Sequence, residues 1–97
     1  KVGIGRVSHY YGKIGVAELV LESGYVEEGE RLLVTGPTTG AVFFEAKQML
    51  LGDTSERRSR IDEIGIPFSV KVLEEVRPGD RLFVMRKRKK ERGSKYF

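Results

Sequence analysis

The sequence predicts an all-β domain, a small closed six-stranded antiparallel barrel. Three observations lead to this fold class. The chain has 97 residues, which is room for one modest hydrophobic core. Its apolar residues fall in short runs that are rich in β-branched side chains. Its 12 glycines and closely spaced turn sequences separate those runs, and closing such short strands into a barrel removes unpaired sheet edges.

The first half of the chain contains three clear strand patterns. Residues 1–8 form the first predicted strand, where glycines between apolar residues are typical of a bulge or a tight bend. Residues 9–13 interrupt the apolar pattern and are expected to form a hairpin connection. Residues 14–21 and 31–35 are the next predicted strands. Residues 41–51 fit both a helical face and a strand alternation, and we favour a strand because the surrounding segments are strand-like.

The second half contains two loops and two strand patterns. Residues 36–40 hold one proline between glycines, and residues 52–60 are polar, so both segments are expected to break regular structure. Residues 81–85 form the last predicted strand. The clearest alternation lies in residues 64–72, and it predicts one strand with five inward side chains. These side chains are Ile64, Ile66, Phe68, Val70 and Val72.

One seven-residue pattern occurs twice in the chain. Residues 26–32 and 76–82 both read apolar residue, two polar or turn residues, glycine, acid, arginine, leucine. The physical interpretation is that the same turn enters a core strand twice. Seven residues are too few for a tandem repeat array.

The positive charge is concentrated at the C-terminus. The formal net charge is +4, but residues 86–97 carry seven basic side chains and one acidic side chain. Residues 1–85 carry 11 basic and 13 acidic side chains. The sequence therefore predicts a barrel domain over residues 1–85 and a flexible basic tail over residues 86–97, and only the tail has the electrostatic character of a nucleic-acid-binding segment.

Composition excludes several classes of protein. The absence of cysteine excludes disulfide frameworks, zinc fingers and thiol catalysis. No Gly-Lys-Ser or Gly-Lys-Thr tripeptide is present, so a phosphate-binding loop of the Walker type is excluded. No apolar run approaches the ~20 residues of a membrane span. We expect no catalytic residue, no cofactor, no metal and no membrane partner. We also expect a cytoplasmic location. Because the first residue is lysine and not methionine, we expect the chain to be processed or cut from a longer protein.

The first candidate binding residues lie at the predicted hairpin. His9, Tyr10 and Tyr11 form a polar aromatic cluster whose rings can stack on nucleic-acid bases, while Lys13 can meet a phosphate. The alternative is that one tyrosine caps the barrel and keeps its hydroxyl group in water.

Two further candidate sets are basic. Arg57, Arg58 and Arg60 can contact phosphates from a loop, or can belong to an ordinary solvated loop. The beginning of the tail is a run of five cations that can neutralise RNA phosphates or serve as a linker. These cations are Arg86, Lys87, Arg88, Lys89 and Lys90.

Several landmarks resemble a known family. The segments Gly5-Arg6-Val7, 26–32, Gly36-Pro37, Gly65-Ile66 and 78–82 resemble the second domain of the translational GTPases, as in elongation factor Tu and initiation factor two. This resemblance implies a six-stranded antiparallel barrel. The stretch from Gly5 to Ala17 is similar to small elongation-factor-like barrels and to the C-terminal barrel of some collagenase-like peptidases.

Two functions follow from these expectations. The first is a non-catalytic translation-factor module that contacts RNA or the ribosome. The alternative is an accessory barrel of a collagenase-like peptidase, which positions a protein substrate while another domain of a larger parent enzyme does the chemistry. The isolated chain is expected to have no enzymatic activity, and the sequence leaves its oligomeric state open.

Overall fold

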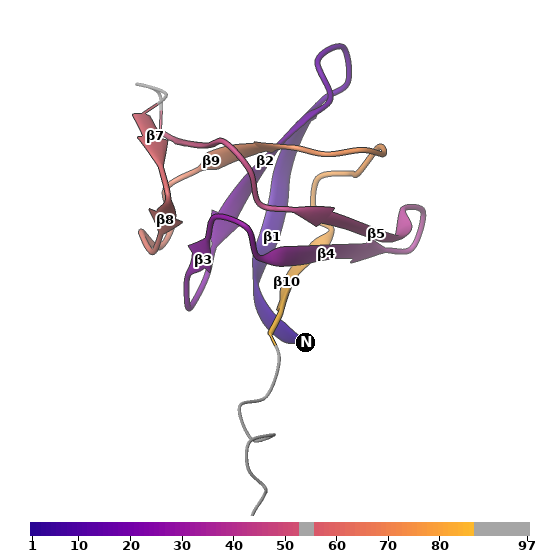
Figure 1. Ribbon diagram of the computed structural model, residues 1–97. Helices are drawn as coiled ribbons and strands as arrows, with labels where there is room; N and C mark the ends of the chain where they lie inside the picture. Colours follow the sequence, from indigo (N-terminus) through magenta and orange to yellow (C-terminus); the bar gives the residue numbers. More distant parts are fainter. Residues whose placement is uncertain (53–55, 87–97) are drawn as a thin grey trace, which may run out of the picture.

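The computed structural model describes residues 1–52 and 56–86. These residues form ten β-strands (Figure 1), and the described residues include no helix that could cross a membrane. The strands are β1 (Val2–Tyr11), β2 (Val16–Leu21), β3 (Val26–Glu27), β4 (Arg31–Gly36), β5 (Gly40–Glu45), β6 (Met49–Leu51), β7 (Glu56–Arg58), β8 (Arg60–Ile61), β9 (Phe68–Lys71) and β10 (Arg81–Met85).

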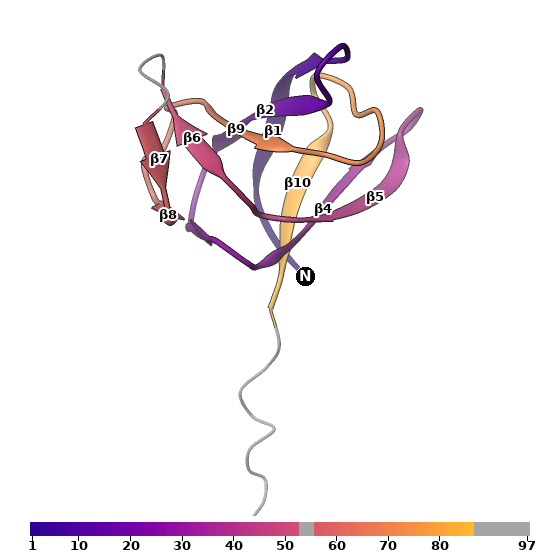
Figure 2. The ribbon, with the colours of Figure 1, turned by 45° about the horizontal axis from the view of Figure 1, so that its top comes forward.

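Eight strands form one antiparallel sheet in the order β5-β4-β10-β1-β2-β9-β6-β7, and β3 pairs with β8 in a second sheet. The all-β antiparallel class is therefore confirmed. A closed six-stranded barrel is not seen, because β5 and β7 end the large sheet with one partner each among the described residues. β5 is at one end of this sheet and β6 is next to the other end, but only the three residues 46–48 separate them in the chain. The sheet therefore curls so that these two strands come close together (Figure 2).

The concave side of this curled sheet holds the core. Alternate side chains of each strand point inward, and the largest fully buried ones include Phe68, Ile4, Leu19, Leu21 and Met49. One continuous apolar cluster joins all the main strands. Most outward side chains of the same strands are accessible to solvent or a partner, but Val20 and Leu33, which lie outside this cluster, are also buried.

The glycines of β1 form a bulge, as the sequence predicts, and Gly5 also permits a close approach to β2. The pairing of β1 with β10 shifts register between Gly3 and Gly5, which marks a bulge. A Cβ atom at Gly5 would lie 2.1 Å from the backbone oxygen of Val20. No other residue fits there without displacing β2.

The repeated seven-residue pattern forms the same turn twice. Gly29 and Gly79 both have positive φ, at 94° and 91°. The acid that follows each glycine accepts a hydrogen bond from the backbone N–H three residues earlier, Glu27 to Glu30 and Arg77 to Asp80, both at 2.9 Å. Each turn leads into a core strand, β4 or β10, and these two strands pair with each other. The predicted equivalence of the two segments is confirmed.

The ambiguous segment 41–51 is extended, which confirms the strand preference. It consists of β5 and β6 with a break between them. Gln48 in this break has a φ of 54°, a left-handed conformation that shifts the side-chain alternation. As a result Met49 is buried and Leu50 faces outward.

Two expectations for the second half are wrong. The strand predicted from residue 64 begins only at Phe68, and Ile64 and Ile66 are 53% and 44% exposed instead of facing inward. The cause is Gly65, whose φ of 81° turns the chain, followed by Pro67, which cannot donate a strand hydrogen bond. The polar segment 52–60, expected to be irregular, contains β7 and begins β8. The predicted tail, apart from Arg86, lies outside the described residues.

The hairpin connection is also shorter than predicted. The first strand was expected to end at residue 8, but β1 continues through His9 and Tyr10 to Tyr11. The connection is a turn over residues 12–15, closed by hydrogen bonds from the N–H groups of Ile14 and Gly15 to the carbonyl oxygen of Tyr11, at 3.2 and 3.0 Å. The aromatic cluster therefore lies on a strand, where its side chains alternate between the two faces.

A candidate binding groove on the outer face of the sheet

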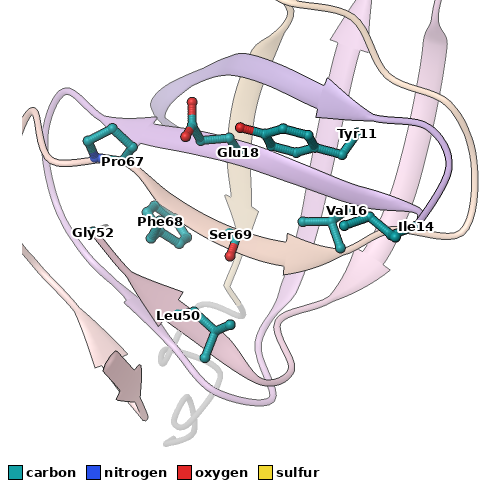
Figure 3. A pocket seen from close by; sticks show the side chains of 9 residues that line it. All are labelled: Tyr11, Ile14, Val16, Glu18, Leu50, Gly52, Pro67, Phe68 and Ser69. Atoms are coloured by element: carbon teal, nitrogen blue, oxygen red, sulfur yellow. The ribbon is translucent and has the colours of Figure 1, made fainter. Parts of the chain in front are cut away.

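A groove lies on the outer face of strands β2, β9 and β6 (Figure 3). It consists of two adjoining cavities of about 290 and 250 Å³ that share Val16, Leu50 and Ser69. The first cavity is also lined by Tyr11, Ile14, Glu18, Gly52, Pro67 and Phe68. The second is also lined by Gln48, Arg57, Val70 and Lys71.

The groove residues face outward because of the strand register. His9 pairs with Glu18, Glu18 with Ser69, Ser69 with Leu50, and Leu50 with Arg57. These five residues therefore form one row across five adjacent strands. Next to Glu18, Ser69 and Leu50 in the chain, the preceding and following residues are mostly buried in the core. All members of the row except His9 line the groove.

Exposed apolar side chains form one wall of the groove. Ile14 is 62% exposed and Tyr11 is 44% exposed, and both lie at the end of the β1–β2 hairpin. Figure 3 shows the Tyr11 ring lying along β2, with its hydroxyl end directed toward Glu18. With Val16 and Leu50 on the floor, these side chains give a contact surface for an apolar group of a ligand.

The polar groups of the groove are held in place. The hydroxyl group of Ser8 donates to Glu18 Oε1 at 2.8 Å and to the carbonyl oxygen of Glu18 at 3.1 Å. Among the residues that the structure describes, Glu18 is the charged residue that lines the first cavity, and Arg57 and Lys71 are those that line the second. The groove therefore has an acidic half and a basic half.

The row does not have the order that nucleophilic catalysis requires. A nucleophilic serine needs a base beside it and an acid behind that base. Here Glu18 lies between Ser69 and His9, and the His9 ring instead packs against Tyr11 with ring centroids 4.3 Å apart. In residues 1–52 and 56–86 no group of three histidine, aspartate or glutamate side chains is placed to hold a metal ion. The arrangement is suited to binding.

The structure separates the predicted aromatic candidates. His9 and Tyr11 are exposed and in contact with each other, and Tyr11 lines the groove. Tyr10 points the other way and packs against the core. This position fits the alternative interpretation, in which one tyrosine covers the core instead of binding a nucleic acid. Lys13 is exposed in the hairpin turn.

The arginines at 57–60 each have an acidic partner. Arg57 contacts Glu28 at 3.4 Å in an exposed pair. Arg58 donates to Glu63 Oε2 at 2.7 Å, and this bond lowers the pKa of the Glu63 carboxyl.

Arg60 contacts Glu27 at 2.8 Å and Asp62 at 3.4 Å. These pairs and that of Arg58 engage two of the three arginines of the predicted patch, whereas the pair of Arg57 is long and exposed.

Arg86 is also held within the domain. Its guanidinium donates to both oxygens of Glu30, at 2.7 and 3.0 Å, and to the carbonyl oxygen of Tyr25 at 2.8 Å. The guanidinium groups of Arg86 and Arg60 each lie 4.0 Å from the centre of the Tyr25 ring. The other four tail candidates, Lys87, Arg88, Lys89 and Lys90, lie outside the described residues.

The hairpin candidates and Arg86 lie at opposite ends of the domain. Val2, at the start of β1, pairs with Val84, two residues before Arg86. Tyr11 is at the far end of the same ten-residue strand, which spans roughly 30 Å at the usual rise per residue. Figure 1 shows the hairpin and the end of β10 on opposite sides of the molecule. The structure therefore does not bring the hairpin and Arg86 into one patch.

The sequence did not reveal the centre of the groove. Glu18, Leu50 and Ser69 come from three separate strands and belong to no motif. Their common position depends on the pairing of β2 with β9 and of β9 with β6. The only usable signal is the polar or outward position of each within its own strand.

The sequence is similar to parts of known peptidases. A collagenase of Porphyromonas gingivalis (strain ATCC BAA-308 / W83) is 35% identical over 89 residues, covering 91% of this chain and 20% of the collagenase. An uncharacterized protease of Methanocaldococcus jannaschii is 34% identical over 86 residues, covering 89% of this chain and 20% of the protease. The chain thus spans about a fifth of the length of these curated relatives. No family model matches the chain.

The fold is that of a solved peptidase domain. The C-terminal domain of a Geobacillus thermoleovorans U32 peptidase superposes with a TM-score of 0.78, at 13% identity, over 86% of this chain and 91% of that domain. Its selenomethionine variant gives a TM-score of 0.77. The similarity to the barrel of collagenase-like peptidases is confirmed. The prediction of a translation factor acting in protein biosynthesis is wrong, because these relatives are collagenases, a protease and a U32 peptidase domain. The shared turn landmarks specify a β-fold and not a function.

Proposed function

We propose that this chain is an accessory domain of a collagenase-like peptidase, and that its groove holds a polypeptide substrate for a catalytic centre located elsewhere in the parent protein. The relatives support this function, since they are collagenases and a protease that are about five times longer than the matched segment. The partner that this proposal implies is the rest of a larger parent protein.

The observation that carries the proposal is the shape and lining of the groove. It is an open surface over three strands with apolar side chains on its floor and wall. Hydroxyl, carboxylate and amide groups lie between these apolar side chains. Small molecules are usually enclosed by deep cavities, whereas extended peptides bind along open grooves with separate pockets for alternate side chains. The groove fits the second kind of ligand.

The order of polar groups also supports a binding role. Ser69 has Glu18 on one side and Leu50 on the other. Ser69 therefore has a carboxylate beside it but no histidine, which is not the order of a serine, histidine and acid triad. We therefore assign the chemistry of peptide cleavage to the rest of the parent protein.

The test is binding of denatured collagen to the 97-residue chain, because two of the relatives are collagenases. Two substitutions provide a matched pair. Ile14→Ser removes an apolar side chain from the groove wall, and Ile64→Ser removes one of similar exposure that does not line the groove. We expect Ile14→Ser to weaken binding about fivefold or more, the loss of one apolar contact. Ile64→Ser should bind as the unmodified chain does.

Two outcomes would contradict the proposal. One is equal weakening by both substitutions, or by neither, since the groove would then not be the binding surface. The other is the absence of binding to denatured collagen together with saturable binding of single-stranded RNA, which would restore the RNA interpretation of the chain.

A further inference from the structure

The charges of the groove are sorted by sign along its length. Glu18 lines only the first cavity, and no lysine or arginine among the described residues lines that cavity. Arg57 and Lys71 line only the second cavity, which has no described aspartate or glutamate. Leu50 and Ser69 lie between the two halves and belong to both cavities. A ligand that lies along the cross-strand row therefore meets the acid Glu18, an apolar patch and the base Arg57 in that order.

The strand register sets the spacing of these features. Glu18 and Arg57 are three strands apart in one cross-strand row, which corresponds to about 14 Å at the usual distance between strands. In an extended peptide the side chains of residues i, i+2 and i+4 point the same way, and i and i+4 are about 13 Å apart. The row therefore matches the length of a five-residue extended peptide that lies along it.

The charged groups of the groove are open to a ligand. Glu18 is fixed by Ser8, which is a neutral donor and leaves the negative charge uncompensated. The side chain of Arg57 is 63% exposed, and its pair with Glu28 is long at 3.4 Å. Exposed pairs of this kind contribute little and exchange readily for another carboxylate. Lys71 forms no ion pair with any other described residue.

We infer that the groove selects extended peptides with a basic residue at position i, an apolar residue at i+2 and an acidic residue at i+4. The inference rests on the proposed function, because it specifies the substrate class of the same groove. The basic side chain meets Glu18. The apolar side chain lies between Ser69 and Leu50, and the acidic side chain meets Arg57. A peptide of the same composition with its two charges exchanged can match these charges only by lying in the groove in the opposite direction.

The test compares peptides of identical composition. The 97-residue chain is titrated into fluorescein-labelled, end-blocked Gly-Lys-Ser-Leu-Ser-Glu-Gly and into Gly-Lys-Glu-Leu-Ser-Ser-Gly, in which the acid is moved to i+1. Binding is followed by fluorescence anisotropy at low salt. We expect the first peptide to bind about five- to tenfold more tightly, because the displaced acid faces away from the basic half and toward solvent.

A charge-neutral variant tests the assignment of residues. Glu18→Gln with Arg57→Gln removes both charges and leaves a polar amide at each position. We expect this double variant to bind the two peptides within about twofold of each other. The Glu56→Gln variant is the control, since Glu56 is an exposed carboxylate that does not line the groove. It should keep the full preference.

The outcomes separate this inference from the proposed function. If both peptides bind equally and Ile14→Ser weakens both, the groove holds polypeptides but the charge order plays no part, and the inference is overturned. The same follows if the double variant keeps the full preference. If neither peptide nor denatured collagen binds, the proposed function itself fails and the inference fails with it.

Discussion

Glu30 and Asp80, fifty residues apart, occupy equivalent positions in two copies of one turn. Each carboxylate accepts a hydrogen bond from the backbone N–H three residues before it, at 2.9 Å. Each also holds a second group from a distant segment: Glu30 binds the Arg86 guanidinium, and Asp80 accepts a hydrogen bond from the Thr39 hydroxyl. The two acids therefore fasten the start of β4 and the start of β10 to other parts of the domain.

The first prediction concerns Asp80, which is 5% exposed. Asp80→Ala should lower the free energy of unfolding by about 2 to 3 kcal/mol, because the Thr39 hydroxyl and the Arg77 N–H lose a charged acceptor. Urea denaturation followed by circular dichroism measures this change. The exposed Asp62→Ala is the control and should cost less than about 1 kcal/mol. Equal losses in the two variants would show that the buried turn contributes nothing special.

The second prediction concerns the pH dependence of stability. Burial alone would raise the pKa of Glu30, but hydrogen bonds from Arg86 and from the Glu27 N–H outweigh burial and lower it. The folded chain then binds fewer protons at Glu30 than the unfolded chain does in acid. This stabilisation is complete well above the ordinary value of 4.5 and is lost as the pH falls through the lowered pKa.

Glu30→Gln should therefore be less stable than the unmodified chain at neutral pH and should lose less stability between about pH 5 and pH 3. Urea denaturation at a series of pH values measures both effects. Glu74→Gln, at an exposed carboxylate with no ion pair among the described residues, should follow the unmodified chain. The same loss of stability between about pH 5 and pH 3 in Glu30→Gln and in the unmodified chain would contradict the assignment.

The third prediction concerns the core. Phe68 is 1% exposed and Phe43 is 41% exposed, so the two residues form a matched pair of phenylalanines. Phe68→Ala should lower the free energy of unfolding by about 3 to 5 kcal/mol because it leaves a cavity in the apolar core. Phe43→Ala should cost about 1 kcal/mol or less. Thermal or urea unfolding of the two variants is the measurement, and a cost under about 1 kcal/mol for Phe68→Ala would contradict the observed packing.

The fourth prediction concerns RNA. If the chain binds single-stranded RNA, replacing Arg58 and Arg60 by Gln should change the slope of log affinity against log salt by less than about 0.7, the share of one phosphate contact. The reason is that both guanidinium groups are already paired with carboxylates. RNA titrations at several salt concentrations measure the slope. A decrease of about 1.4 or more would mean that both ion pairs open toward phosphate.

Local pattern was sufficient for much of the fold. β-Branched runs identified β2, β4 and β10, and the repeated turn was recognisable because its glycine and acid are required at fixed positions. The error at residues 64–67 and the break within residues 41–51 have a common cause. Gly65 and Gln48 take left-handed conformations that reset the side-chain alternation, and periodicity alone does not show where such a reset occurs.

The groove was beyond the reach of local pattern. His9 and Arg57 were both candidate residues, but for separate RNA contacts, and nothing in the sequence placed them in one row. That row exists because β9 inserts between β2 and β6. Strand order of this kind is decided by packing of the whole core, so Glu18, Leu50 and Ser69 became visible only in three dimensions.

The most direct test of the binding groove is a titration of the ¹⁵N-labelled 97-residue chain with denatured collagen, followed residue by residue through amide chemical shifts. We expect the largest shifts at Ile14, Val16, Glu18, Leu50 and Ser69, which line the groove. Amides around Gly40 and Phe43 on β5, which lie outside the groove, should stay unchanged. Shifts centred on β5 or on the segment after Arg86, with the groove amides unmoved, would contradict the assignment of the groove as the polypeptide-binding surface.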